Sequence, residues 1–110
     1  MVGTWTDSAG IYHGFYWTEA AGFTSFDPPK ATRTLPSAIN ASGVIAGSFT
    51  IDSLYQVSRG FMLDTTNGVF TIIKVPGSTT TNANGINSQG TIVGSYEVGK
   101  LPGGSFLYQP

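Results

Sequence analysis

The sequence predicts an all-β fold of short antiparallel strands. Fifteen glycines and six prolines, together with many Thr and Ser residues, interrupt the 110-residue chain at short intervals. Between these breaks lie short runs rich in aromatic and β-branched residues, which is typical of strands. No window of a dozen residues shows the apolar period of a helix, about 3.6 residues. A long internal repeat with strand character is the third observation that favours this fold class.

The expected strands follow one another along the whole chain. Each is a run of aromatic, Val, Ile or Thr residues that ends at a Gly, Pro, Asn or Asp cluster. Their approximate limits are Val2–Thr6, Ile11–Thr18, Phe23–Asp27, Val44–Thr50, Val57–Asp64, Val69–Val75, Thr91–Glu97 and Gly104–Tyr108, with shorter strands near Ser37–Ile39 and Asn84–Ile86.

The chain repeats itself at a constant offset. Phe23–Phe49 aligns without a gap onto Phe70–Tyr96, 47 residues further on, and 11 of the 27 aligned pairs are identical. A period of about 40 to 50 residues with strand character indicates propeller-type blades or another repeat array. The identical pairs are Phe23/Phe70, Thr24/Thr71, Pro29/Pro76, Thr32/Thr79, Thr34/Thr81, Ile39/Ile86, Asn40/Asn87, Gly43/Gly90, Ile45/Ile92, Gly47/Gly94 and Ser48/Ser95.

The repeat extends on both sides of this alignment. Gly3 corresponds to Gly47 and Gly94. Phe15, in the strand that follows Gly3, likewise corresponds to Phe61 and Phe106. We therefore expect tandem repeats of about 47 residues, built of short antiparallel strands. These repeats are expected to be β-propeller blades of about four strands, and the ring is expected to be completed by self-association. One β-repeat domain, 1–110, would hold a partial repeat at 1–36, a full repeat at about 37–83 and a partial repeat at 84–110.

Neither face of the strand expected at Ile11–Thr18 is plainly polar. One face carries His13, Phe15 and Trp17, and the other carries tyrosines. A sheet that is apolar on both faces must be covered on both, as happens when sheets stack. The segments Asn40-Ala41-Ser42-Gly43 and Asn87-Ser88-Gln89-Gly90 predict turns in which the Asn side-chain oxygen accepts a backbone N–H and the Gly adopts positive φ.

Three parts of the chain resemble the bacterial HAF family of extracellular repeats. They are Ile86–Tyr96, Gly68–Thr79, and the triplet His13-Gly14-Phe15 with its counterpart Arg59-Gly60-Phe61. The resemblance covers nearly the whole chain and implies tandem β-repeats, each a blade of about four strands. It also implies secretion, and it is the only basis for expecting an extracellular location. It implies no activity.

Members of that family usually carry many repeats, whereas this chain has parts of three. A propeller ring needs about four or more blades. Three arrangements follow: a fragment of a longer array, copies that assemble to complete a ring, or another compact β fold. In an assembled ring the terminal strands, Val2–Trp5 and Gly104–Tyr108, would lie at the interfaces.

Composition excludes several classes of function. Five Lys or Arg residues oppose six Asp or Glu residues, for a net charge of −1, and no basic cluster is present to neutralise phosphates. We therefore expect neither a nucleic-acid partner nor a membrane partner. Met1–Trp5 lacks the basic start and apolar run of a secretory signal. The absence of Cys excludes disulfides and thiolate metal sites.

His13 is the only histidine, and the aligned position in the next repeat is Arg59. A metal site or a Ser–His–Asp site would therefore need scattered carboxylates to converge on it. A glycosidase would likewise need two carboxylates about 5 to 10 Å apart, and Asp27 and Asp64 are the candidates. Local hydrogen bonding at a sheet edge is the favoured interpretation of His13, and we expect no metal or cofactor.

The leading functional hypothesis is a non-enzymatic β-repeat module that self-assembles, as a dimer first and a trimer next, into a binding or scaffold surface. The alternative is a carbohydrate-binding, lectin-like module with a glycan ligand, held by aromatic faces beside polar groups. A small hydrolase that uses Asp27, Asp64 or His13 is the third hypothesis. If a ligand binds, the expected residues are Tyr12, His13, Tyr55, Gln56 and Arg59.

Overall fold

The computed structural model describes residues 1–20, 22–52, 57–99 and 101–109. These residues form ten strands and no helix, which confirms the all-β prediction. The strands are β1 (Val2–Thr6), β2 (Tyr12–Thr18), β3 (Gly22–Phe26), β4 (Arg33–Ile39), β5 (Val44–Thr50), β6 (Ser58–Asp64), β7 (Val69–Ile73), β8 (Thr80–Ile86), β9 (Ile92–Val98) and β10 (Leu101–Tyr108).

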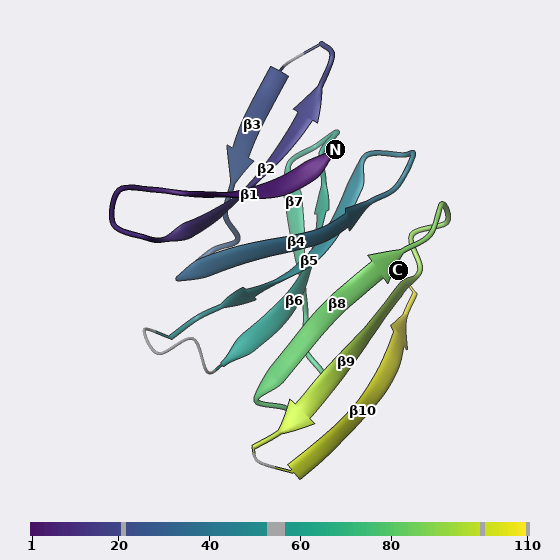
Figure 1. Cartoon of the computed structure of the whole chain (residues 1–110). Helices are drawn as coiled ribbons and strands as arrows, with labels where there is room; N and C mark the ends of the chain where they lie inside the picture. Colours follow the sequence, from purple (N-terminus) through teal and green to yellow (C-terminus); the bar gives the residue numbers. More distant parts are fainter. Residues whose placement is uncertain (21, 53–56, 100, 110) are drawn as a thin grey trace.

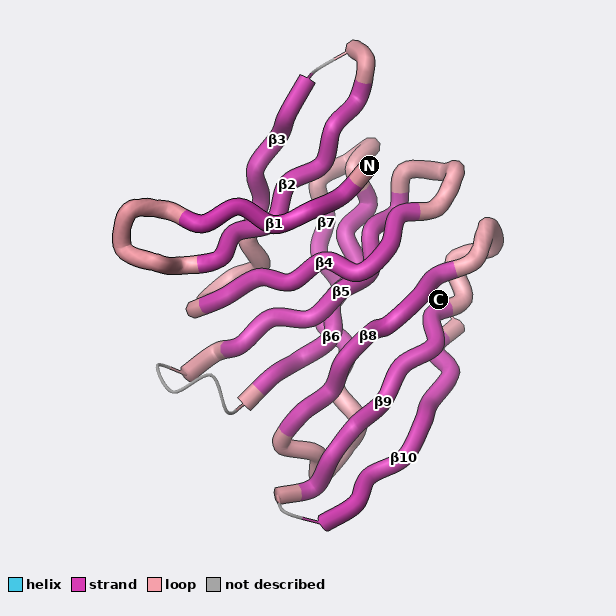
Figure 2. The backbone as a smooth tube through the Cα atoms, viewed as in Figure 1, coloured by secondary structure: helices cyan, strands magenta, loops and turns pink. Residues whose placement is uncertain are grey.

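The strands form three antiparallel sheets (Figures 1 and 2). The N-terminal sheet has the order β1-β2-β3, the middle sheet β4-β5-β6-β7, and the C-terminal sheet β10-β9-β8. The middle sheet lies between the other two (Figure 1). Neighbouring strands of each sheet follow one another in the chain, so every pairing within a sheet is made by a local hairpin. The molecule is flat, with principal extents of 44 × 37 × 17 Å.

Eight strands lie close to their expected limits, whereas the two short ones are longer than predicted. These two strands, β4 and β8, each contain a shift in register, between Pro36 and Ala38 in β4 and between Ala83 and Gly85 in β8. An irregularity of this kind breaks the two-residue alternation that identifies a strand in a sequence. Pro36 is tolerated because β4 is an edge strand.

Each sheet contains a glycine paired directly with a phenylalanine on the neighbouring strand. The pairs are Gly3 with Phe15, Gly47 with Phe61, and Gly94 with Phe106. A Cβ atom on these glycines would lie 2.6 Å, 2.9 Å and 2.5 Å from the phenylalanine ring, respectively. The ring therefore lies flat over the glycine backbone, and no larger residue fits beneath it.

The predicted asparagine turns are confirmed. Asn40 Oδ1 accepts hydrogen bonds from the backbone N–H groups of Ser42 and Val44, at 3.1 and 2.9 Å. Asn87 makes the equivalent bonds, and the glycines that end the two turns have φ of 81° and 86°. The two turns also touch, because Asn40 Nδ2 donates to the carbonyl oxygen of Asn87 at 3.0 Å. Corresponding segments 47 residues apart thus lie side by side.

Two hydrophobic cores join the three sheets. The first lies between the N-terminal and middle sheets, where Phe26 of β3 makes an edge-on contact with Phe61 of β6 at 5.8 Å between ring centroids. The second lies between the middle and C-terminal sheets and centres on Ala46, Ala83 and Ile92, which are fully buried. The middle sheet is therefore covered on both faces. Each end sheet packs on one face only, and this includes the N-terminal sheet, whose strand β2 was expected to be covered on both faces.

The boundaries expected between the repeats of the single domain 1–110 fall inside strands. The junction between 36 and 37 lies in β4 and the junction between 83 and 84 lies in β8. The three sheets instead span 2–26, 33–73 and 80–108. The 47-residue offset gives the length of the repeat but not the residue at which each repeat begins. The pairing of the strands is needed to place the boundaries.

Candidate functional site

A histidine held between two carboxylates is the most organised polar group in the described part of the chain. His13 Nε2 lies 2.8 Å from Asp7 Oδ2, and His13 Nδ1 lies 2.7 Å from Asp27 Oδ2. His13 is on β2, Asp7 is in the β1–β2 turn, and Asp27 directly follows β3. The side chains of His13, Asp7 and Asp27 are 21, 30 and 38 % exposed, respectively, so the cluster is partly accessible to solvent.

Both carboxylates are held in place by their second oxygen. Asp7 Oδ1 accepts the backbone N–H groups of Ala9 and Ile11, at 2.8 and 3.0 Å. Asp27 Oδ1 accepts the hydroxyl of Thr34, at 2.6 Å, and Thr34 is fully buried. Each aspartate therefore presents its free oxygen to His13 in a fixed direction, and Asp27 links the N-terminal sheet to β4 of the middle sheet.

The hydrogen bonds to Asp7 and then Asp27 raise the pKa of His13 above its ordinary value of 6.5. The hydrogen bond from His13, followed by that from the Ile11 backbone, lowers the pKa of Asp7 below 3.8. Only the protonated ring can donate from both nitrogens at once, so this geometry stabilises a charged imidazolium. Neither nitrogen faces a serine hydroxyl, as a Ser–His–Asp site would require.

We expect replacement of His13 by Asn to remove a pH-dependent part of the stability. Since folding raises the pKa of His13, its contribution is complete below pH 6.5 and is lost as the pH rises through the folded-state value. The Asp7 contribution is present above pH 3.8 and is lost as the pH falls through its lowered value. In thermal melts, the wild type should exceed the variant most near pH 5, and the difference should shrink by pH 9.

Asp64→Asn provides the matched control for this experiment. Hydrogen bonds from the Thr66 side chain and backbone lower the pKa of Asp64, so it is ionised at both pH values. Its replacement should therefore change the melting temperature by the same amount at pH 5 and pH 9. An equal loss at the two pH values for His13→Asn would contradict the assigned charge state.

The structure joins two of the three residues of the hydrolase hypothesis. His13 and Asp27 are in direct contact, whereas Asp64 lies at the end of β6 and accepts hydrogen bonds from Thr66. Asp64 is not one of the described hydrogen-bond partners of His13. The other partner, Asp7, was missed from the sequence. Its signal was the segment Asp7-Ser8-Ala9-Gly10, which has the spacing of the two asparagine turns.

The five predicted ligand residues do not all fall within the described structure. Tyr55 and Gln56 lie outside the described residues. Tyr12 is exposed on β2, and its ring lies 5.9 Å from the guanidinium carbon of Arg33. Arg59 donates to the carbonyl oxygens of Ser58 and Thr79, at 2.9 and 3.4 Å, so it joins β6 to the segment before β8.

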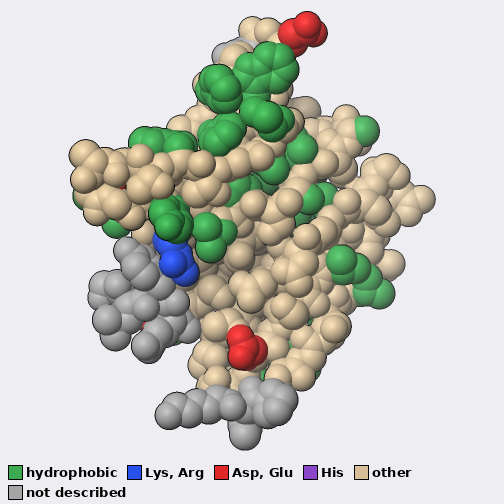
Figure 3. All heavy atoms as spheres, in the orientation of Figure 1, with side chains coloured by type: hydrophobic (Ala, Val, Ile, Leu, Met, Phe, Trp, Pro, Cys, Tyr) green, Lys and Arg blue, Asp and Glu red, His purple; other side chains and the backbone are tan. Residues whose placement is uncertain are grey.

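Aromatic side chains form a shallow hollow on the outer face of the N-terminal sheet, with a volume of about 320 Å³. Trp5, Phe15 and Phe23 line it together with Ser25. The indole of Trp5 stacks on the His13 ring at 4.6 Å, and its Nε1 donates to Ser25 Oγ at 3.0 Å. This hollow therefore adjoins the His13 cluster. Figure 3 shows hydrophobic side chains gathered over the upper part of the molecule, where this sheet lies.

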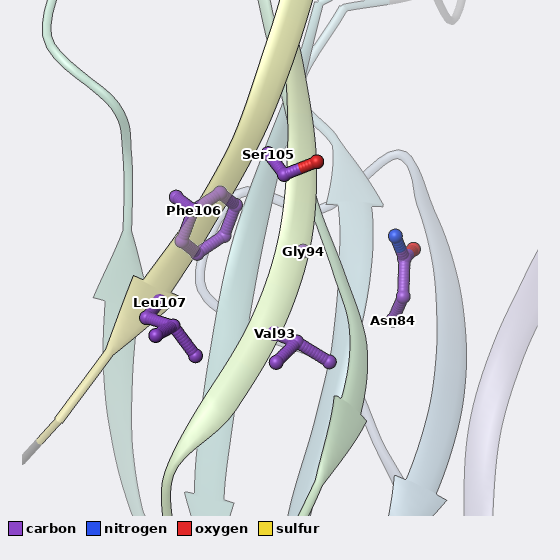
Figure 4. Close-up of a pocket in the computed structure, with 6 residues that line it drawn as sticks. All are labelled: Asn84, Val93, Gly94, Ser105, Phe106 and Leu107. Carbon is purple, nitrogen blue, oxygen red and sulfur yellow. The ribbon is translucent and has the colours of Figure 1, made fainter.

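A second hollow, of about 460 Å³, lies on the outer face of the C-terminal sheet. Val93 of β9 and Leu107 of β10 occupy neighbouring strands there, with Asn84 of β8 beside them (Figure 4). A smaller, more polar groove of about 190 Å³ separates the middle and C-terminal sheets, and it includes Arg33 and Asn82. The groove is smaller than the usual range for ligand pockets, about 300 to 1,000 Å³.

No protein-family model matches this chain, and neither curated proteins nor solved structures give a match. Within residues 1–20, 22–52, 57–99 and 101–109, no three His, Cys, Asp or Glu side chains are grouped to hold a metal ion. The same residues include no helix that is long and apolar enough to cross a membrane.

Proposed function

We propose that this chain is a non-enzymatic β-repeat module that self-associates into a larger binding or scaffold surface. The observation that carries the proposal is the exposure of large apolar side chains on the outer faces of both end sheets, at positions whose counterparts in the middle sheet are buried or half-buried. Exposed apolar faces of this size mark interaction sites, and the end repeats of a stacked array otherwise carry a polar outer face.

The comparison of counterparts is direct on the N-terminal side. Trp5 occupies the position of Phe49, and Trp17 that of Leu63, relative to the paired Gly and Phe of their sheets. Phe49 and Leu63 are 3 and 4 % exposed, whereas Trp5 and Trp17 are 42 and 41 % exposed. The N-terminal sheet thus carries a core-type face with nothing in the described chain to cover it.

The C-terminal side repeats this pattern. Val93 and Leu107 are cross-strand partners, as Ala46 and Met62 are in the middle sheet. Ala46 is fully buried against the next sheet, whereas Val93 and Leu107 are 49 and 69 % exposed. Both ends of the stack therefore present surfaces of the type that packs inside it.

Blade-like stacking is the arrangement we propose for these sheets. The glycine–phenylalanine pair in all three sheets, the paired asparagine turns and the resemblance to HAF repeats each support a blade of about four strands. Three sheets per chain make a ring of six from two copies, or of nine from three. The dimer falls within the usual four to eight blades, so we favour it over the trimer.

The chemistry at His13 favours a structural role over catalysis. Both of its nitrogens are bonded to aspartates that are themselves held by other groups. A general base needs a free nitrogen within reach of a substrate proton. The cluster instead ties the β1–β2 turn to the start of the middle sheet and supports the aromatic face beside it.

Light scattering after size exclusion tests the proposal over a hundredfold range of concentration. We expect a mass of two chains, with three as the next candidate, compared with 11.6 kDa for one chain. A folded protein that keeps the mass of one chain at every concentration would refute self-association. Far-UV circular dichroism of the same fractions shows whether a small species is folded.

A carbohydrate-binding module remains the second candidate because the exposed indole of Trp5 lies beside polar groups. Its ring stacks on His13, and its Nε1 donates to Ser25. His13 in turn contacts two partly exposed aspartates. Aromatic faces beside hydrogen-bonding groups are suited to sugar rings. A glycan array would support this candidate through a hit that Trp5→Ala removes. Folded protein without any hit would argue against it.

A further inference from the structure

We infer that copies of this chain associate head to tail, through two different faces. The N-face is formed by Trp5, Phe15, Trp17 and Phe23, and the C-face by Val93 and Leu107. The N-face of one copy packs against the C-face of the next. This inference rests on the proposed self-association and adds to it the surfaces and the direction.

The packing inside the chain has a direction. The face of the middle sheet that carries Gly47 and Phe61 packs on the N-terminal sheet, against Phe26. The face of the C-terminal sheet that carries Phe106 packs on the middle sheet, in the core that contains Ala46. In both interfaces, the glycine–phenylalanine face of the later sheet meets the opposite face of the earlier sheet.

The two free faces at the ends of the stack are of opposite kinds. The N-face contains the Gly3–Phe15 pair, so it is the glycine–phenylalanine face of its sheet. The C-face contains Val93 and Leu107, which alternate along their strands with Gly94 and Phe106 and so lie on the other side. Only a contact between an N-face and a C-face repeats the combination found in the two internal interfaces.

A two-fold contact would instead place like faces together. Two N-faces would oppose the exposed rings of Trp5, Trp17 and Phe23, a combination that neither internal interface contains. Two C-faces would oppose two hollows that are each lined by Val93, Phe106 and Leu107. Neither C-face carries exposed indole rings such as those of Trp5 and Trp17 to fill the other. Head-to-tail contact fills these hollows, because a cavity of about 150 Å³ already accepts a benzene ring and the C-face hollow is about 460 Å³.

A head-to-tail contact leaves one N-face and one C-face free on every open chain of copies. Such heterologous contacts either close into a ring or extend into a filament. Two copies supply six sheets, which is enough for a closed ring of the propeller type. Closure would leave no apolar end face exposed, whereas a dimer joined through two like faces would leave the other face uncovered on each copy.

Cross-linking between single cysteines tests the direction of the contact. The chain has no native cysteine, so one introduced thiol per copy is unambiguous. We would prepare Phe23→Cys and Leu107→Cys on copies with different affinity tags and treat them with a short bis-maleimide. Each of these side chains is 69 % exposed in a single copy, so both variants should still fold.

The expected result is a cross-link only in the mixture, between Cys at one face and Cys at the other. Val69→Cys is the matched control, because Val69 is 55 % exposed on β7 and belongs to neither face. It should cross-link with neither variant. All reactions use protein that light scattering shows to be assembled.

The outcomes separate this inference from the proposed function. A cross-link formed by Phe23→Cys alone, or by Leu107→Cys alone, would show a two-fold contact and overturn the direction while leaving self-association intact. An assembled protein that gives no cross-link in any combination would also overturn the two faces. A wild-type chain that is monomeric at every concentration would refute both proposals and place a different partner on these faces.

Discussion

Phe61→Ala is expected to lower the free energy of unfolding by about 3 to 5 kcal/mol, the usual cost of truncating a buried phenylalanine. Phe61 is fully buried and lies at the centre of the first core, with ring contacts to Phe26, Phe49 and Phe70 at 5.8 to 6.2 Å. Its removal leaves a cavity that rings from two sheets cannot refill. Since domains of this size are stable by only about 5 to 15 kcal/mol, the variant should lose roughly between a fifth and all of its stability.

Urea denaturation measures this loss, and Phe23→Ala is the matched control. Phe23 is also a strand phenylalanine but is 69 % exposed, so its truncation should change stability by well under about 1 kcal/mol in the monomer. The comparison should be made at low concentration, because association would add its own stabilisation. Equal losses in the two variants would contradict the placement of the first core.

Gly47→Ala is expected to cost about 1 to 3 kcal/mol, the range for overpacking a filled site. A Cβ at this position would lie 2.6 Å from Pro36 Cα and 2.7 Å from the Leu35 carbonyl oxygen, both of which are backbone atoms. The neighbouring strand β4 would have to move, and the Phe61 ring could no longer pack against the backbone of residue 47. Thermal unfolding should show a lower melting temperature.

Gly85→Ala is the control for this substitution. The only neighbour of a Cβ at Gly85 is a methyl group of Val93 at 3.5 Å, which is an ordinary contact. Its stability should therefore equal that of the wild type or exceed it slightly, because alanine restricts the unfolded chain. A loss in Gly85→Ala as large as that in Gly47→Ala would show that glycine is required for its backbone freedom and not for the space above it.

Much of the fold was predictable because its contacts are local. Each sheet is built from consecutive hairpins. Strands such as Val44–Thr50 and turns such as that at Asn40 can therefore be recognised from the residues within them. The strand at Arg33–Ile39 was only partly recognised, since the register shift at Pro36 interrupts its alternation. The stacking of sheets was inferred from apolar residues on both faces of the strand at Ile11–Thr18. The middle sheet is covered on both faces, whereas the sheet that contains this strand is covered on one.

The candidate site was harder to predict because its partners come from different strands. His13 was recognised as the only histidine, and local hydrogen bonding was the favoured interpretation, but neither aspartate partner could be assigned. Asp7 reaches His13 across the β1–β2 turn, and Asp27 reaches it from the end of β3. Titratable residues that are far apart in the sequence form a site only when folding brings their side chains together, as the two hairpins do for Asp7, His13 and Asp27.

The strand content, the turns and the 47-residue period can be predicted from the amino-acid sequence, because each depends on residues that are close in the chain or identical at a fixed offset. Which sheet face is covered by another sheet, and hence which rings are buried, is known only from the packing of the folded chain. Phe15 and Phe61 each follow a glycine in the sequence and each pair with a glycine on the neighbouring strand. Phe61 is nevertheless covered by Phe26, whereas Phe15 lies at the open end of the stack. Burial depends on whether another sheet is present above the ring, and that is a property of the packed molecule.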